Sequence, residues 1–162
     1  MPTMMTSPQA ATPVEQQAKF DNFYAELAPV LIDFIDVLGI EPAHEVLQQA
    51  CDYLPYVEKA LADMAIADEE DRKWLLVRMM YYIGEYFAQQ YGGYWLINET
   101  RGSSLFGHCV VGKFSSFPNS AIMIDPFDIA SAYVDLPCPR QLHELIAEVE
   151  MGLAGAVGPG LH

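Results

Sequence analysis

Basic residues are scarce in this sequence: eight lysines and arginines stand against 22 aspartates and glutamates in 162 residues. The formal net charge is therefore −14 at pH 7, and the isoelectric point is near 4.4. A chain this acidic is repelled by nucleic-acid phosphates and by anionic lipids, so we predict neither a nucleic-acid nor a membrane partner. It is attracted to basic protein surfaces, although the charge could also serve only to keep the protein soluble.

Cysteine and histidine are also scarce. Cys51, Cys109 and Cys138 are far apart and odd in number, which predicts reduced thiols and a cytoplasmic location. The four histidines form no His-x-x-x-His pair, and no two cysteines have Cys-x-x-Cys spacing, so we expect no metal site and no cofactor. The sequence lacks an apolar run of the roughly 20 residues that span a bilayer. It also lacks the basic and apolar segments of a secretory signal.

Residues suited to nucleophilic catalysis are present without a recognisable arrangement. Ser103-Ser104 and His108-Cys109 could converge in space, but no nucleophile-elbow pattern surrounds them. We therefore expect no catalytic residue, and whether the chain is an enzyme stays open.

Glu85 lies in the middle of an apolar helical segment. Such a carboxylate could be a buried general acid or base. Alternatively, it lies on a solvated stripe of the helix or forms an ion pair with Arg78 or Arg101.

The segment 68–92 is typical of a long helix that is packed on several sides. Asp68 is a suitable N-cap, and three acidic residues follow it where the helix dipole favours anions. Gly92 is placed to end the helix with a positive φ. Gly84 costs roughly 1 kcal/mol relative to alanine in a helix. We expect it to allow another backbone to approach closely, most simply from the sheet that follows.

The rest of the pattern predicts an α+β fold: N-terminal helices, the long central helix, a three-stranded antiparallel meander, then C-terminal helices. Helices are expected from 14, from Pro29 to 38, from Pro42 onwards with a boundary at Pro55, from Pro126 after the cap Asp125, and over 140–153. Strands are expected over 94–98, 108–114 and 121–124, and their short links require antiparallel pairing. We expect a disordered leader over 1–13, one α+β domain over 14–153 and a flexible tail over 154–162.

Acidic residues gather in the first part of the chain. Residues 1–66 contain ten acids and two bases, a net charge of −8. Together with the acidic run that opens the central helix, they predict a surface that binds a partner. Its residues are Asp33, Asp36, Asp63, Asp68, Glu69, Glu70 and Asp71.

Three short runs carry a resemblance: Ile83-Gly84-Glu85-Tyr86-Phe87, Tyr91-Gly92-Gly93-Tyr94-Trp95 and Ile124-Asp125-Pro126-Phe127. Over about residues 70–135 the chain resembles small uncharacterised bacterial domains in which a Gly-Glu helix runs into Gly-Gly-x-Trp, a short meander and an Asp-Pro helix. Some of these look like immunity proteins, which neutralise a toxin of the producer's own secretion system. The resemblance implies an inhibitor of a basic toxin or effector, and it transfers no catalytic residue.

Two alternatives to a protein-binding domain remain open. A small-molecule-binding domain or enzyme would have a pocket between the central helix and the meander. Its residues would be Tyr81, Glu85, Trp95, Arg101 and His108. The chain could also be an oligomeric structural or adaptor protein, for example a homodimer.

Overall fold

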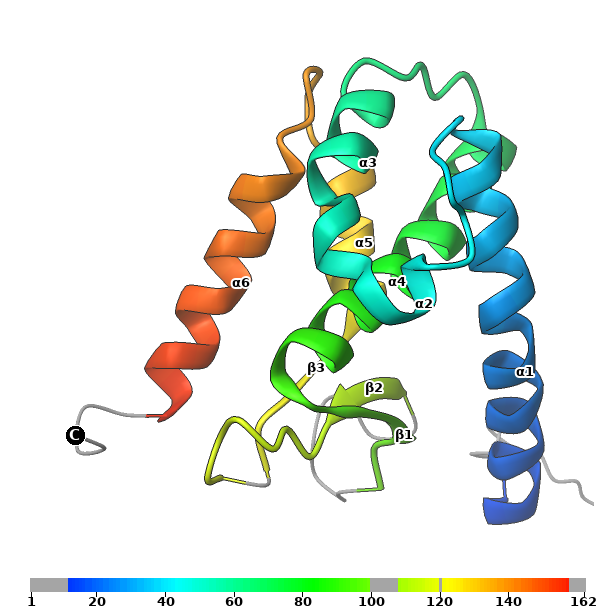
Figure 1. Ribbon diagram of the computed structural model, residues 1–162. Helices are drawn as coiled ribbons and strands as arrows, with labels where there is room; N and C mark the ends of the chain where they lie inside the picture. Colours follow the sequence, from blue (N-terminus) through cyan, green and yellow to red (C-terminus); the bar gives the residue numbers. More distant parts are fainter. Residues whose placement is uncertain (1–11, 100–107, 120, 158–162) are drawn as a thin grey trace, which may run out of the picture.

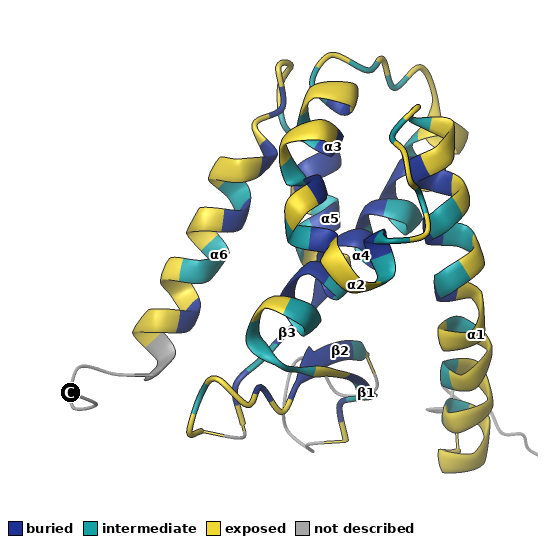
Figure 2. Ribbon diagram, in the orientation of Figure 1, coloured by how far each residue is buried: buried dark blue, intermediate teal, exposed yellow. Residues whose placement is uncertain are grey.

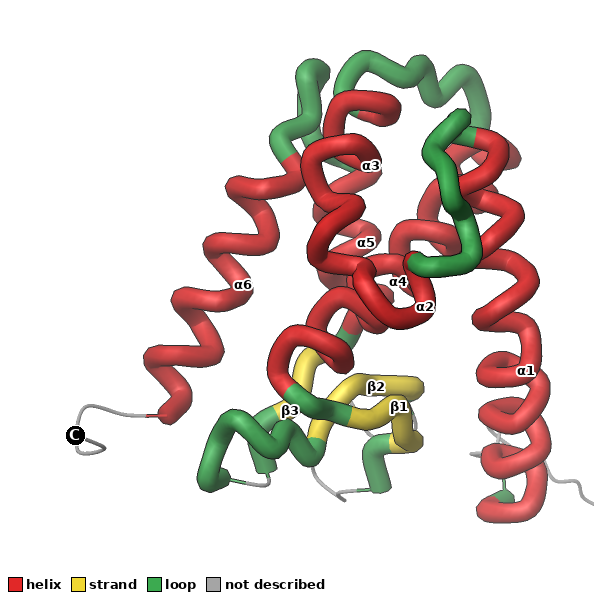
Figure 3. The backbone as a smooth tube through the Cα atoms, in the orientation of Figure 1, coloured by secondary structure: helices red, strands yellow, loops and turns green. Residues whose placement is uncertain are grey.

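The computed structural model describes residues 12–99, 108–119 and 121–157. It has the predicted α+β architecture, with helices around a small antiparallel sheet (Figures 1 and 3). In chain order the elements are α1 (Pro13–Val37), α2 (Val46–Gln49), the 3₁₀ helix η1 (Ala50–Tyr53), α3 (Leu54–Leu61), α4 (Glu69–Tyr91), β1 (Tyr94–Ile97), β2 (Cys109–Gly112), β3 (Met123–Ile124), α5 (Pro126–Val134) and α6 (Leu142–Val157).

Helix α4 runs through the centre of the molecule, as predicted. Asp68 caps it, since the Asp68 carboxylate accepts a hydrogen bond from the backbone N–H of Asp71 at 2.9 Å. Gly92 ends it with a φ of 66°. Leu75, Met79 and other core side chains of this helix are fully buried, and α4 is among the darkest segments of Figure 2.

The three strands form the expected meander in the order β1-β2-β3, and both pairs are antiparallel. Trp95 lies opposite Val111, which in turn lies opposite Ile124. All three side chains are buried and join the core that surrounds α4. The sheet therefore has one face in the core, and it closes one end of the helical part.

Gly84 explains how β1 lies against α4. A Cβ atom at this position would lie 2.0 Å from Cζ2 of Trp95, so the bare glycine makes room for the indole. The next residue fixes the ring, because Nε1 of Trp95 donates a hydrogen bond to Oε1 of Glu85 at 2.9 Å. Gly84 thus admits a side chain of the following strand, whereas we had predicted the approach of a backbone.

The predicted helix boundary at Pro29 is wrong. Pro29 lies inside the single helix α1, on its exposed side. A proline inside a helix removes its own N–H bond and crowds the carbonyl four residues before it, at a cost of about 3 kcal/mol. Leu27, Leu31, Phe34 and Ile35 nevertheless form one buried stripe on both sides of Pro29. That continuous stripe holds the helix together across the proline.

Two other helical regions differ in their bounds. The segment predicted from Pro42 is divided into α2, η1 and α3. The last helix begins at Leu142 and continues to Val157, into the segment predicted as a tail. The predicted leader at 1–11, the turn at 100–104 and the end at 158–162 lie outside the described residues.

Arg140 joins the start of α6 to the end of α3. Its side chain is only 4% exposed, and Nη1 donates hydrogen bonds to the carbonyls of Leu61 (3.0 Å) and Met64 (2.9 Å). Carbonyls at a helix C-terminus have no partner within the helix, and a cation there also suits the helix dipole. A residue far along the sequence thus completes the end of α3.

Candidate functional site

The arginines of the described chain are held in internal contacts. Arg140 is buried, as described above. Arg78 lies over the ring of Trp74, with 4.4 Å between its Cζ atom and the ring centroid, and it donates to the Trp74 carbonyl. Arg72 donates to both carboxylate oxygens of Asp135, at 3.1 Å each. Arg72 thus offsets the charge of Asp135 at the surface, whereas the charge of Arg140 lies inside the protein.

The carboxylates, by contrast, are mostly at the surface. Exposed residues of this kind are Glu15, Asp21, Glu26, Asp33, Asp36, Glu41, Asp52, Asp63, Asp68, Glu69, Glu70, Asp71, Glu99, Asp128, Asp135, Glu144 and Glu148. Among the described residues, the exposed bases are four lysines: Lys19, Lys59, Lys73 and Lys113. The surface is therefore strongly negative.

Six of the seven predicted partner-binding residues lie where α1 ends and α4 begins, two segments that contact each other through Phe34 and Trp74 (Figure 1). The seventh, Asp63, follows the end of α3. Part of this group stabilises α4 itself. Asp68 is the N-cap, the carboxylate of Asp71 accepts from the N–H of Ala67 at 3.2 Å, and Glu69 lies 3.8 Å from Arg72. The others make no side-chain hydrogen bond to a described residue: Asp33, Asp36, Asp63 and Glu70.

A second group of acids, which the sequence analysis missed, surrounds a hollow of about 430 Å³ between the α1–α2 connection and η1. We call it the acidic hollow, and it is lined by Glu41, Glu45, Asp52, Tyr53 and Tyr56. The Tyr56 side chain is 61% exposed, whereas Tyr53 is buried and donates to the Pro42 carbonyl. Burial raises the pKa of Tyr53, and the charges of Glu45 and Asp52 raise it further. The acids and tyrosines at 41–56 are evident in the sequence. The three short helices that carry them have no clear hydrophobic periodicity, so the sequence does not predict that these side chains surround a hollow.

The predicted pocket between α4 and the meander is filled at its centre by the Trp95 indole. Glu85 accepts from this indole and from Nε2 of Gln89 at 3.1 Å, so it forms no ion pair with Arg78. The Tyr81 hydroxyl donates to the Phe23 carbonyl at 2.8 Å, and burial raises the pKa of Tyr81 to about 12. Arg101 lies outside the described residues, and His108 lines a separate hollow whose walls include Met80 of α4 and Cys109 of β2.

His108 instead pairs with Asp125, a residue that we had predicted only as a helix cap. Nδ1 of His108 lies 2.6 Å from Oδ2 of Asp125, and Oδ1 accepts from the N–H of Phe127 at 2.9 Å. The Asp125 side chain is 3% exposed and that of His108 is 46% exposed. The carboxylate therefore orients the imidazole and leaves its Nε2 atom for another partner.

A hollow of about 380 Å³ adjoins this pair, and we call it the His108 hollow. Its other walls are Phe23, Met80, Cys109 and Phe127. Burial raises the pKa of the Cys109 thiol, and the nearby Asp125 carboxylate raises it further. The thiol is thus kept protonated, which does not suit a nucleophile.

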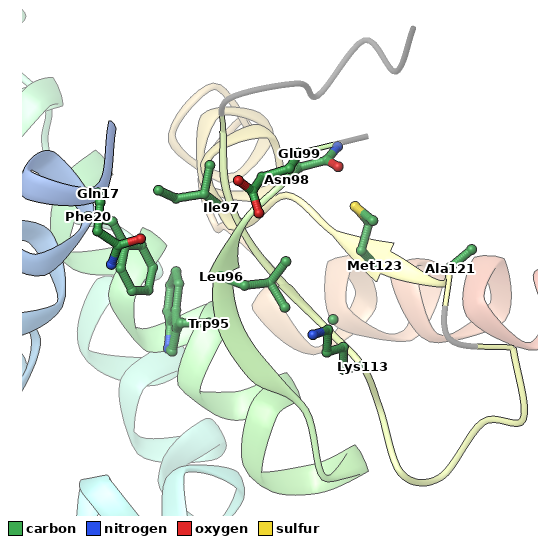
Figure 4. A pocket seen from close by; sticks show the side chains of 11 residues that line it. Gln17, Phe20, Trp95, Leu96, Ile97, Asn98, Glu99, Lys113, Ala121 and Met123 are labelled. Carbon is green, nitrogen blue, oxygen red and sulfur yellow. The ribbon is translucent and has the colours of Figure 1, made fainter. Parts of the chain in front are cut away.

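A further hollow, of about 620 Å³, runs along β1 between the start of α1 and the sheet (Figure 4). Five consecutive residues, Trp95 to Glu99, line it from the strand. Gln17 and Phe20 face it from α1, and Lys113 and Met123 lie on the opposite side of β1 in Figure 4.

No protein-family model, curated protein or solved structure matches the chain. The resemblance to immunity-type domains therefore stays a prediction. Within the described ranges, no three His, Cys, Asp or Glu side chains are grouped closely enough to hold a metal ion. None of the described helices has the length and hydropathy needed to cross a bilayer.

Proposed function

We propose that this chain is an acidic, cytoplasmic protein-binding domain that docks a basic face of another protein. The observation that carries the proposal is the large excess of exposed carboxylates over exposed lysines, while the described arginines are bound to other groups of the chain. The resemblance suggests the more specific form of an immunity-type inhibitor of a basic toxin or effector. The three cysteines are free, which suits a reducing compartment.

The acidic hollow is the best-formed part of this surface for recognition. Its carboxylates can accept charge-assisted hydrogen bonds from an arginine, and the exposed ring of Tyr56 can stack on a guanidinium. The remaining carboxylates raise the rate of encounter with a basic partner.

The test compares two triple variants that change the net charge equally. One removes the hollow's acids, Glu41→Gln, Glu45→Gln and Asp52→Asn. The control, Glu26→Gln, Asp128→Asn and Glu148→Gln, alters exposed acids elsewhere. A partner captured from the source cells on the wild type would be purified and its dissociation constant measured with each variant. We expect the hollow variant to bind about tenfold more weakly, a loss of about 1.4 kcal/mol.

Because the control keeps the hollow, it should weaken binding by no more than about twofold, the effect of a general change in charge. Affinity should also fall as salt rises. Equal losses in the two variants would contradict recognition at the hollow. A partner whose affinity does not depend on salt, or the failure to retain any basic protein, would contradict the proposed function itself.

A small-molecule site is the second candidate function, and the His108 hollow favours it. Apolar walls with one oriented polar group are typical of ligand sites, and the volume lies in their usual range. The net charge of −14 disfavours anions, so a neutral aromatic alcohol is the best fit. Its hydroxyl would donate to Nε2 of His108, while its ring would lie against Phe23 and Phe127.

This site is tested with para-cresol and with toluene, which lacks the hydroxyl. We expect para-cresol to shift the NMR signals of Met80 and Phe127 at a concentration about fivefold below that needed for toluene, since one hydrogen bond contributes about 1 kcal/mol. His108→Gln should remove the difference. His143→Gln is the matched control, because His143 also pairs with a carboxylate, Glu58, at 2.6 Å but does not line the His108 hollow. Equal titration curves for the two compounds would exclude this site.

A further inference from the structure

Among the described strands, β1 pairs on one side only, and we call its other side the free edge. The sheet order places it next to β2 only, and its four residues are Tyr94, Trp95, Leu96 and Ile97. Edge strands usually carry lysine, proline or a bulge that discourages pairing with another chain. The sequence of β1 contains no such charge or proline, and Tyr94 is 67% exposed. This edge is therefore suited to accept a further strand.

The register shows which backbone groups lie on that edge. The N–H of Asn98 donates to the carbonyl of His108 at 2.9 Å, so these two residues form a hydrogen-bonded pair. Such pairs alternate along an antiparallel ladder. Tyr94 and Leu96 therefore direct their backbone groups to β2, and Trp95 and Ile97 direct theirs to the free side. No described residue hydrogen-bonds to the backbone of Trp95 or Ile97 from that side.

The hollow of about 620 Å³ lies along this edge. It is lined by all of Trp95 to Glu99, which shows that the strand itself forms one wall (Figure 4). Phe20 lies on one side of β1, next to Trp95, and Leu96 and Met123 lie on the other. An added strand needs a spacing of about 4.8 Å from β1, and its side chains alternate between the two sides. The hollow thus offers apolar contacts to both sets of side chains.

We infer that the free edge of β1 binds an extended peptide segment of a partner protein, which pairs with the backbone of Trp95 and Ile97 as a fourth strand. The segment alternates apolar and basic residues, since Phe20, Leu96 and Met123 offer apolar contacts while Glu99 and the chain's negative surplus favour cations. Lys113, the base at this hollow, lies across the strand from Phe20 (Figure 4).

A peptide fits this site better than a second copy of the chain. Helix α1 lines the same hollow through Gln17 and Phe20, so the space beside β1 is bounded. Pairing between two copies would bring a whole second sheet and its own α1 into that space. A single extended segment adds only one strand beside β1.

The inference does not depend on the acidic hollow, so either site can fail while the other holds. The probe is an acetylated and amidated heptapeptide, Lys-Val-Lys-Val-Lys-Val-Lys. Its control is the same sequence with every residue N-methylated, which keeps the charge and side chains but blocks both backbone edges. Amide hydrogen exchange of the full chain is followed by NMR, with and without each peptide.

We expect the heptapeptide to slow exchange at Trp95 and Ile97 at least tenfold and to leave Leu96 unchanged, because Leu96 already bonds to β2. The N-methylated peptide should have no such effect. Ile97→Pro, which removes an outward N–H at a position where edge strands tolerate proline, should weaken binding at least tenfold. The Glu41, Glu45 and Asp52 variant should keep the protection, which separates this site from the acidic hollow.

Two results would overturn the inference. The first is measured in the free protein. If the amides of Trp95 and Ile97 exchange as slowly as the amide of Leu96, the edge is already paired. Equal binding of the N-methylated peptide would show that charge alone attracts the probe. Both results can be read from the wild-type chain, even if the Ile97→Pro variant does not fold.

Discussion

Replacing Gly84 by alanine is expected to destabilise the protein by about 2 kcal/mol, the usual scale of overpacking in a filled core. Helix propensity alone predicts the opposite, since alanine is favoured over glycine by about 1 kcal/mol inside a helix. We expect destabilisation because of the position of Trp95, whose Cζ2 and Cη2 atoms would lie 2.0 and 2.1 Å from the new methyl group. The indole cannot retreat without losing its hydrogen bond to Glu85.

Two further variants make this prediction specific, with urea denaturation as the measurement. Gly152→Ala is the matched control: Gly152 also lies in a helix, but nothing lies within 4 Å of its missing Cβ. It should stabilise the protein by about 0.5–1 kcal/mol. In a Trp95→Phe background, which lacks the colliding ring, Gly84→Ala should become neutral or stabilising. Additive effects of the two changes would show that Trp95 is not the cause.

The Gly84–Trp95 contact also gives the sequence pattern 83–95 a physical meaning. Gly84 makes room for the indole, Glu85 binds its N–H, and Gly92 turns the chain so that Trp95 returns to the same helix. These residues act as one packing unit that joins α4 to the sheet. Packing alone therefore explains the spacing of Gly84, Glu85, Gly92 and Trp95.

Elements with local signals could be predicted from the sequence. The caps of α4, the strands of the meander and the Asp125-Pro126 start of α5 each depend on residues within a few positions, and all are confirmed. The α1 prediction failed because a local rule about Pro29 was weaker than a buried stripe that continues past it. Tertiary packing therefore determined the bounds of α1, and such packing cannot be predicted from the sequence of one segment.

The candidate sites were less predictable, because each joins residues from separate elements. The surplus of acid was evident, but the partners of the arginines were not: Arg72 and Arg140 bind groups 63 and 79 positions away. The acidic hollow depends on how three short helices turn. His108 and Asp125 come together only because β2 and β3 pair, which sets the end of one strand beside the start of α5.

Alkaline unfolding between pH 10 and 12 is the second large effect that we expect, and buried tyrosines are its cause. Tyr81, Tyr82, Tyr86 and Tyr133 are at most 8% exposed. Burial raises the pKa of Tyr81, Tyr86 and Tyr133 to about 12, and it also raises that of Tyr82. An unfolded tyrosine titrates near 10. The stabilisation from these neutral side chains is therefore complete below about pH 10 and is lost as the pH rises through the folded values.

The size of the effect follows from proton linkage. In this window the unfolded chain binds fewer protons, so each such tyrosine lowers the free energy of unfolding by about 1.4 kcal/mol per pH unit. Four of them give a slope near 5 kcal/mol per pH unit, compared with the roughly 5–15 kcal/mol that holds a typical domain folded. Urea denaturation from pH 9 to 12, together with tyrosinate absorbance, measures this slope directly.

Tyr133→Phe and Tyr82→Phe separate the titration from the hydrogen bonds. The Tyr133 hydroxyl is buried without a hydrogen-bond partner among the described residues, so its removal should cost nothing at pH 7 and should reduce the slope by about a quarter. The Tyr82 hydroxyl donates to the Ala50 carbonyl at 2.8 Å, so its removal should also cost about 1 kcal/mol at pH 7. A free energy of unfolding that stays constant from pH 9 to 12 would contradict this account, because it would mean that these phenols ionise equally easily in the folded and unfolded chain.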